Sequence, residues 1–181
     1  SPPRIAPLGP QAGLNPGWSL DLTTCDPEGR PWNFDDEGCR ARARRLVRES
    51  KPILLVGSPM CTWFSQLQGL NRARMDPQVY KRQVERAISH MVFMCRLYRE
   101  QINAGRYFLH EHPAGASSWG LSCVKGIERM SGVQIVKANM CCFGMTSIDP
   151  DGREGPVSKP TKFMTNAPGV AKALNQRCAG G

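Results

Sequence analysis

Apolar and polar positions recur along the chain in two different periods, and together they predict helices separated by short strands. Apolar residues at helical spacing predict helices over four ranges: 35–49, 76–104, 117–132 and 168–177. Short apolar runs predict strands over five ranges: 18–22, 53–56, 106–110, 133–137 and 162–165. Because strands and helices alternate, we expect a mostly parallel sheet with helices on both faces.

Residues with known positional preferences mark the ends of these elements. Asp76 and Pro77 suit the N-cap and first position of a helix, and Gly105 suits its end. Asp35 or Asp36 can cap the helix before it, in which Cys39, Ala43, Leu46 and Val47 form one apolar stripe. Ser117 or Ser118 is expected to cap the third helix. Residues 1–16 are rich in proline and glycine and are expected to be irregular, and 149–156 are expected to be a polar turn.

Length and composition favour one domain. A chain of 181 residues can bury one sizeable core, so residues 1–181 are expected to form a single α/β domain. The eight cysteines are irregularly spaced, which favours reduced thiols in an intracellular protein of the nucleus or cytoplasm. No signal peptide opens the chain and no apolar run could cross a bilayer, so no membrane partner is expected.

A formal net charge of +9 favours an acidic partner, with nucleic acid before an anionic membrane surface. Five arginines crowd one predicted helix: Arg40, Arg42, Arg44, Arg45 and Arg48. We expect this group to be mainly a solvated helix face.

Three predicted strands end in chemically useful residues. Asp21 ends the first strand, the loop 57–61 with Cys61 follows the second, and Glu111 lies at the end of the third. Because ligands in such sheets gather beyond the carboxyl ends of the strands, these groups are expected to lie along one edge. Cys61 is either a nucleophile on a turn or a small buried apolar side chain, and the sequence leaves both open.

Two short segments carry a family resemblance. GSPMCTWFS, around Cys61, resembles the catalytic loop of DNA cytosine-C5 methyltransferases, and FLHEHP, around Glu111, resembles their glutamate-bearing strand. The segments MCCFG and KPTKFMTN resemble a later part of the family. The chain departs from the family pattern at Met60, Thr62, His112 and Pro113, and a glycine-rich cofactor loop is not evident. The resemblance is to a compact phage-like or mobile-element-like member that lacks a target-recognition domain.

The resemblance implies a fold, an activity and a cofactor. The fold would be a Rossmann-like three-layer sandwich with a mostly parallel sheet, in which the first strand could be missing. The activity would be methyl transfer from S-adenosylmethionine to carbon-5 of cytosine, in DNA rather than RNA. Cys61 would add to carbon-6 of the base, and Glu111 would hydrogen-bond to the edge of the base.

The resemblance and analogy with other nucleotide sites also suggest binding residues. Cofactor binding is assigned to four residues: Asp21, Asp35, Ser58 and Pro59. Nucleic-acid binding is assigned to five residues: Ser65, Arg72, Arg74, Lys159 and Lys162. Two alternatives stay open, a catalytically inactive nucleic-acid-binding scaffold and a metal-dependent nucleic-acid enzyme. The second would use His110 and His112, which alternate along a strand and so face one way, with Glu111 opposite.

Overall fold

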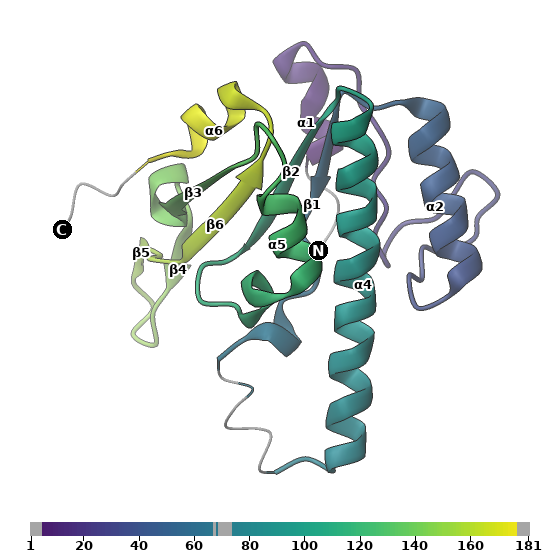
Figure 1. Cartoon of the computed structure of the whole chain (residues 1–181). Coiled ribbons are helices and arrows are strands. Elements are labelled where there is room, and N and C mark those ends of the chain that lie inside the picture. The colour runs from purple at the N-terminus through teal and green to yellow at the C-terminus, as the bar shows by residue number, and fades with distance from the viewer. Residues whose placement is uncertain (1–4, 67, 69–73, 177–181) are drawn as a thin grey trace. The chain divides into compact units, whose positions relative to one another are not determined.

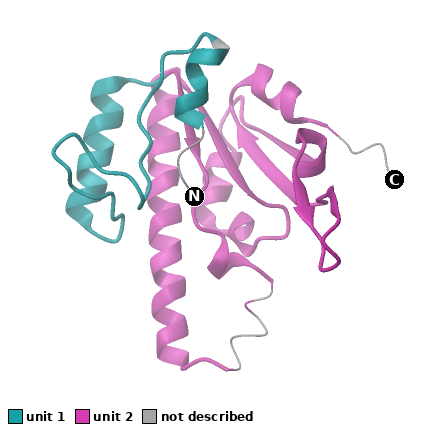
Figure 2. Ribbon diagram, turned by 180° about the vertical axis from the view of Figure 1, so that it is seen from behind, with its two compact units in different colours: residues 1–52 teal, residues 53–181 magenta. Residues whose placement is uncertain are grey.

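The computed structural model describes residues 5–66, 68 and 74–176. The chain forms two compact units, Ser1–Pro52 and Ile53–Gly181, which are coloured separately in Figure 2. The residues that resemble a catalytic loop and its partner strand all belong to the second unit. No helix among the described residues is long and apolar enough to cross a membrane.

The first unit is built from short helical segments and one longer helix. Residues 5–12, expected to be irregular, form the helix α1 (Ile5–Leu8) and a 3-10 turn (Gly9–Ala12). The strand expected at 18–22 is wrong, because Asp21 lies in a turn that Thr23 and Thr24 close with their hydroxyl groups. Helix α2 (Glu37–Ser50) begins as expected, since the Asp36 carboxylate accepts hydrogen bonds from the amides of Gly38 and Cys39.

A buried carboxylate organises the first unit and changes the interpretation of its arginines. The Asp26 side chain is only 3% exposed and forms ion pairs with Arg30 at 2.8 Å and Arg42 at 3.0 Å. The Arg42 guanidinium also lies 5.1 Å from the ring centre of Trp32, which is 2% exposed. Arg42 was expected on a solvated face, but it instead neutralises a buried acid and covers an indole.

The second unit contains most of the regular structure (Figure 1). Its strands are β1 (Leu54–Gly57), β2 (Tyr107–Pro113), β3 (Gln134–Asn139), β4 (Thr146–Ile148), β5 (Glu154–Pro156) and β6 (Pro160–Thr165). Its α-helices are α4 (Pro77–Asn103), α5 (Ser122–Glu128) and α6 (Pro168–Leu174). Its 3-10 turns are η2 (Thr62–Phe64), η3 (Ser117–Gly120) and η4 (Met140–Phe143). Most bounds lie within a few residues of those that the sequence predicts.

The capping residues of α4 are as predicted, whereas those of the following helix are not. Asp76 accepts the amides of Gln78 and Val79, and Gly105 adopts a positive φ of 68° after the last turn. The segment expected to be one helix from 117 to 132 divides into η3 and α5. Neither Ser117 nor Ser118 caps it with a side chain, because η3 and α5 start from Ala116 and Leu121 without such a bond.

The main sheet corrects the predicted fold class. Its strand order is β1-β2-β6-β3, and β1 and β2 are parallel, whereas β6 is antiparallel to both β2 and β3. A second sheet consists of the antiparallel pair β4 and β5. The second unit is therefore a mixed α/β fold, and the expectation of a mostly parallel Rossmann-like sandwich is wrong.

The connection between β3 and β6 explains this error. Parallel strands need a crossover of a dozen or more residues that is usually a helix, and α4 and α5 supply such connections before β2 and β3. After β3 the chain instead forms η4 and the β4–β5 hairpin, whose turn is the predicted polar segment around Asp149. With no α-helix there, β6 returns antiparallel and inserts between β2 and β3.

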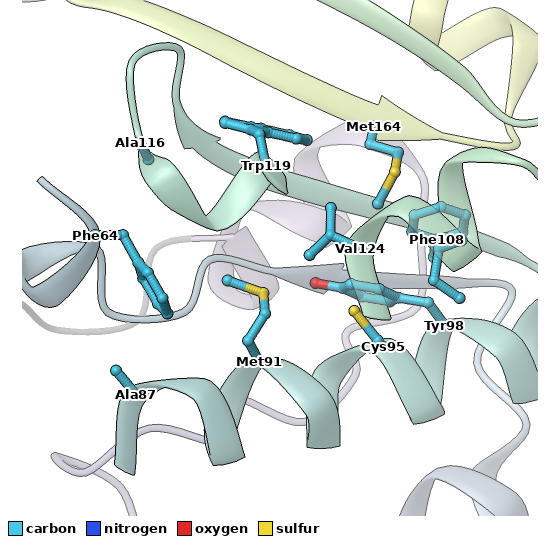
Figure 3. Close-up of a cluster of buried hydrophobic side chains, with 11 residues drawn as sticks. Phe64, Ala87, Met91, Cys95, Tyr98, Phe108, Ala116, Trp119, Val124 and Met164 are labelled. Carbon is cyan, nitrogen blue, oxygen red and sulfur yellow. The ribbon is translucent and has the colours of Figure 1, made fainter. Parts of the chain in front are cut away.

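The core of the second unit lies between the sheet and the helices α4 and α5. Met91 and Tyr98 of α4 pack with Phe108 of β2, Val124 of α5 and Met164 of β6 (Figure 3). The Tyr98 ring stacks on Phe108 at 4.7 Å. The predicted stripe of α4 is thus mostly core, and it fixes the parallel pair β1–β2 whose ends carry the candidate site.

Candidate functional site

The loop after β1 and the end of β2 lie at the same edge of the sheet. Because β1 and β2 are parallel and Gly57 pairs with His110, the next residues along the two strands, Ser58 and Glu111, are neighbours. The Ser58 hydroxyl donates a hydrogen bond to the Glu111 carboxylate. The structure therefore brings the Cys61 loop and Glu111 together, as the sequence predicts.

Cys61 occupies a fixed turn and is neither buried nor fully exposed. It precedes η2, where its carbonyl accepts a hydrogen bond from the Phe64 amide at 3.0 Å. Phe64 is 4% exposed, and its carbonyl accepts a hydrogen bond from the Ser117 hydroxyl at 3.3 Å. Cys39 and Cys95, by contrast, are buried. Of the two interpretations of Cys61, the one that requires a small core side chain is the less consistent with this exposure.

Two buried histidines lie beneath the loop. His110 and His112 face the same side of β2, as predicted, and their rings stack at 5.6 Å. His110 Nδ1 is 3.0 Å from the Tyr98 hydroxyl, and His112 Nδ1 is 2.7 Å from the Ser118 hydroxyl. Trp119 contacts His110 edge-on at 5.3 Å. This cluster supports the end of β2, on which Glu111 is held.

Burial keeps both imidazoles neutral. Removal from water lowers the pKa of His110 to about 3, with a further contribution from His112. Burial also lowers the pKa of His112, while the charge of Glu111 and the nearby backbone of Pro59 and Met60 act in the opposite direction. Within the described residues, neither Nε2 atom has a hydrogen-bond partner, although both are buried. Desolvation raises the pKa of Tyr98 well above its usual value.

The histidine pair predicts loss of stability in mild acid. The pKa of His110 is lower in the folded than in the unfolded chain, so below pH 6.5 only the unfolded form gains a proton. Stability should therefore fall as the pH drops from 6.5, by up to about 1.4 kcal/mol per pH unit from His110, with a further loss in the same direction from His112. Urea unfolding followed by circular dichroism between pH 7.5 and pH 5, both values chosen to bracket the ordinary histidine pKa of about 6.5, measures this slope.

Substitution of one member of the pair tests its origin. His110→Gln removes one of the two buried titrating groups and should reduce the slope, whatever its effect on absolute stability. His90→Gln removes a histidine of α4 outside the pair and should leave the slope in place. An unchanged slope in His110→Gln would show that other groups cause the acid sensitivity.

The same histidines were the basis of the alternative metal interpretation. Both Nδ1 atoms are already occupied by hydroxyl partners, and the described residues contain no group of three metal-ligating side chains. The parts of the chain that the structure describes therefore give this interpretation no third ligand.

The residues assigned to nucleic acid lie in different environments. Lys162 pairs with His112 across the sheet, and its ammonium lies 5.3 Å from the ring centre of Trp119. Burial and the neighbouring Lys137 lower its pKa. Lys159 is close enough to His112 to disfavour protonation of its ring. Lys162 therefore lies beside β2, and Lys159 lies near His112.

The other three residues assigned to nucleic acid lie between η2 and α4 in the sequence. Ser65 follows η2 and donates its amide to Thr62. Arg74 is exposed shortly before α4. Arg72 lies outside the described residues.

The residues assigned to S-adenosylmethionine are divided between the two units. Ser58 and Pro59 belong to the Cys61 loop, where the Ser58 hydroxyl is bound to Glu111. Asp21 and Asp35 belong to the first unit, and Asp21 Oδ1 already accepts both the amide and the hydroxyl of Thr23. These hydrogen bonds lower the pKa of Asp21 and fix it as a turn residue. The described residues therefore do not show a fit to this cofactor.

The positive charge is concentrated in the second unit, which sequence reasoning missed. Residues 53–181 contain 16 Lys and Arg against 8 Asp and Glu, a net charge of +8, whereas residues 1–52 contain 8 against 7. The crowded arginines of α2 add little net charge to the first unit, because all seven acids of residues 1–52 lie within about 20 residues of them. Division of the charge at the unit boundary would have revealed the asymmetry.

Comparisons with known proteins add no relative. A scan against protein-family models, a search of curated proteins and a search of solved structures each give no significant match. The resemblance of the Cys61 and Glu111 segments to cytosine-C5 methyltransferases therefore stays a prediction from two short motifs.

Proposed function

We propose that the second unit binds nucleic acid and adds the Cys61 thiolate to carbon-6 of a cytosine, as the first step of methyl transfer to carbon-5. The observation that carries this proposal is the placement of a half-exposed thiol and a carboxyl group on adjacent parallel strand ends. The Ser58–Glu111 hydrogen bond joins the two groups through the backbone of one short loop. DNA is proposed before RNA, following the resemblance alone.

The proposed step needs a nucleophile and a proton donor that stabilises the negative charge developing on the base. The Cys61 proton passes to solvent, and the new bond joins Sγ to carbon-6 of the ring. The electron pair of the carbon-5–carbon-6 double bond then moves toward carbon-5, which becomes nucleophilic. Glu111 passes a proton taken up from solvent to ring nitrogen N3 and so stabilises the adduct.

The surrounding residues hold these two groups in place. Phe64 and Ser117 fix the turn that carries Cys61, and Ser58 restrains the Glu111 carboxyl group. Lys159 and Lys162 place positive charge near His112 at the end of β2, where a nucleic-acid phosphate would be attracted. A base must leave its stack to reach such a site, which costs a few kcal/mol in a duplex and less in a single strand.

S-adenosylmethionine remains the proposed methyl donor, and when bound it would supply the methyl group that carbon-5 takes. Because the described residues do not show a fit to it, the thiol addition is best tested without it. A suitable probe is an oligonucleotide in which one cytosine is replaced by 2-pyrimidinone. This base lacks the electron-donating amino group, so its carbon-6 is more electrophilic.

The deciding measurement is the intact mass of the full chain after incubation with the 2-pyrimidinone oligonucleotide. We expect one added oligonucleotide, with peptide mapping placing it on Cys61. An oligonucleotide containing 5-fluorocytosine, incubated with S-adenosylmethionine, tests the methyl donor separately. If the first probe binds without any covalent adduct, the proposed chemistry is wrong.

A nucleic-acid-binding scaffold without catalysis is the second candidate. The observation that favours it is the net charge of +8 on residues 53–181, which does not depend on the Cys61 thiol. A scaffold would bind the same oligonucleotides, with affinity that falls as salt rises, and would give no adduct in either experiment.

A further inference from the structure

A hollow lined by aromatic and basic side chains lies beside the Cys61 loop. Its lining residues are Met60, Trp63, Gln83, Arg86, Ala87 and His90. Met60 is 50% exposed and directly precedes Cys61, and Trp63 follows two residues later. The hollow therefore continues directly from the candidate site onto α4.

A second hollow extends the first along α4. It is lined in part by Tyr80, Lys81 and Glu85, and the Tyr80 ring contacts Trp63 edge-on at 6.1 Å. Through this ring contact the two hollows adjoin, and we call them together the α4 groove. Figure 1 shows that the amino-terminal part of α4 extends beyond the sheet, so this part of the helix is not covered by the strands.

Resting on the proposed function, we infer that the α4 groove binds the single-stranded nucleic acid that flanks the reacting base. Bases stack on the Trp63 and Tyr80 rings, and Arg86 and Lys81 contact phosphates. Aromatic faces accept any base, and basic side chains beside them follow the backbone, which is the usual combination in single-strand binding. The charge of +8 on this unit complements such a ligand.

Two basic side chains of the groove, Lys81 and Arg86, differ in their neighbours. Lys81 is 3.9 Å from Glu85 in an exposed ion pair, so part of its charge is already balanced. Arg86 lines the first hollow next to Trp63 and Gln83 and is exposed. Because Arg86 lies beside Trp63, its loss is expected to weaken binding of a strand in the groove.

The test uses the full chain and a fluorescein-labelled single-stranded DNA of about 16 nucleotides, the upper range of known single-strand site sizes. Anisotropy titration gives the affinity at several salt concentrations. We expect Arg86→Gln to weaken binding several-fold and to reduce the salt slope by about one. Tyr80→Leu keeps apolar bulk but removes the ring, and should weaken binding roughly tenfold.

Matched controls separate the groove from general charge and aromatic content. Arg96→Gln removes the same charge from an exposed position of α4, about 15 Å farther along the helix. Trp18→Ala removes an exposed indole from the first unit. Both controls should bind within about twofold of the parent, because neither is among the residues that line the two hollows.

Three results would overturn the inference. One is parental binding by both Arg86→Gln and Tyr80→Leu. Another is binding of the matching duplex at least as tightly as the single strand. The third is equal competition by a poly-glutamate peptide of the same charge, which would indicate an acidic protein partner.

Failure of this inference differs from failure of the proposed function. Single-strand binding that depends on Arg86 and Tyr80, but without a Cys61 adduct, would support the groove as a binding site and contradict the proposed Cys61 chemistry. A parental rate of adduct formation in both groove variants would support the Cys61 chemistry and contradict the role of the groove.

Discussion

Cys61→Ser is expected to abolish adduct formation with the 2-pyrimidinone oligonucleotide while the fold stays intact. A serine hydroxyl is far less nucleophilic than a thiolate at neutral pH, and the substitution changes one atom of a half-exposed side chain. The hydrogen bond from the Phe64 amide goes to the residue's backbone carbonyl and is retained. Intact mass reports the adduct, and circular dichroism with urea unfolding reports the fold.

An exposed cysteine supplies the matched control for this experiment. Cys25 lies in the first unit, and Cys25→Ser should form the adduct at the parental rate. Adduct formation by Cys61→Ser at the parental rate, or loss of it in Cys25→Ser, would show that another thiol reacts. Unfolding of Cys61→Ser would instead identify Cys61 as a structural residue.

Glu111→Gln separates chemistry from binding at the same site. The amide keeps the shape of the side chain and can still bond to Ser58, but it cannot transfer a proton to the base. The rate of adduct formation should fall by about 100-fold or more, while the affinity for the oligonucleotide is retained. Equal losses of rate and affinity would place Glu111 in binding alone.

Gly57→Ala is expected to destabilise the second unit by about 3 kcal/mol or more. A Cβ atom at Gly57 would lie 2.9 Å from Tyr98 Cζ, and nearer still to the Tyr98 hydroxyl and to Met94 Cε. Tyr98 cannot move away easily, because its ring stacks on Phe108 and its hydroxyl meets His110. The added methyl group therefore strains the core directly beneath the Cys61 loop.

The measurement is the urea midpoint of unfolding, with Gly155→Ala as the control. Gly155 lies in the β4–β5 hairpin, where no described atom comes within 4 Å of the position of a Cβ. The control should shift the midpoint little, since an open strand position tolerates alanine. A Gly57→Ala midpoint equal to that of the control would mean that Tyr98 and Met94 repack freely.

Much of the local structure was predictable because it depends on near neighbours in the chain. Asp76 and Gly105 bound α4 by capping and by left-handed backbone geometry, which are properties of a few residues. The alternation of His110, Glu111 and His112 along β2 follows from strand geometry in the same way. Ser117 and Ser118 show the limit, since both residue types favour caps and neither side chain caps a helix here.

The sequence alone determined that Cys61 and Glu111 would follow strands and share an edge, because a helix between two strands favours a parallel pair. Tertiary structure alone decided the rest of the sheet. The segment after β3 has no helix to carry the chain back, so β6 inserts antiparallel between β2 and β3. The burial of His110 and His112, the contact of Tyr98 with Gly57 and the meeting of Tyr80 with Trp63 also join residues distant in sequence. Such contacts depend on how α4 packs against the sheet, and no local pattern of residues encodes them.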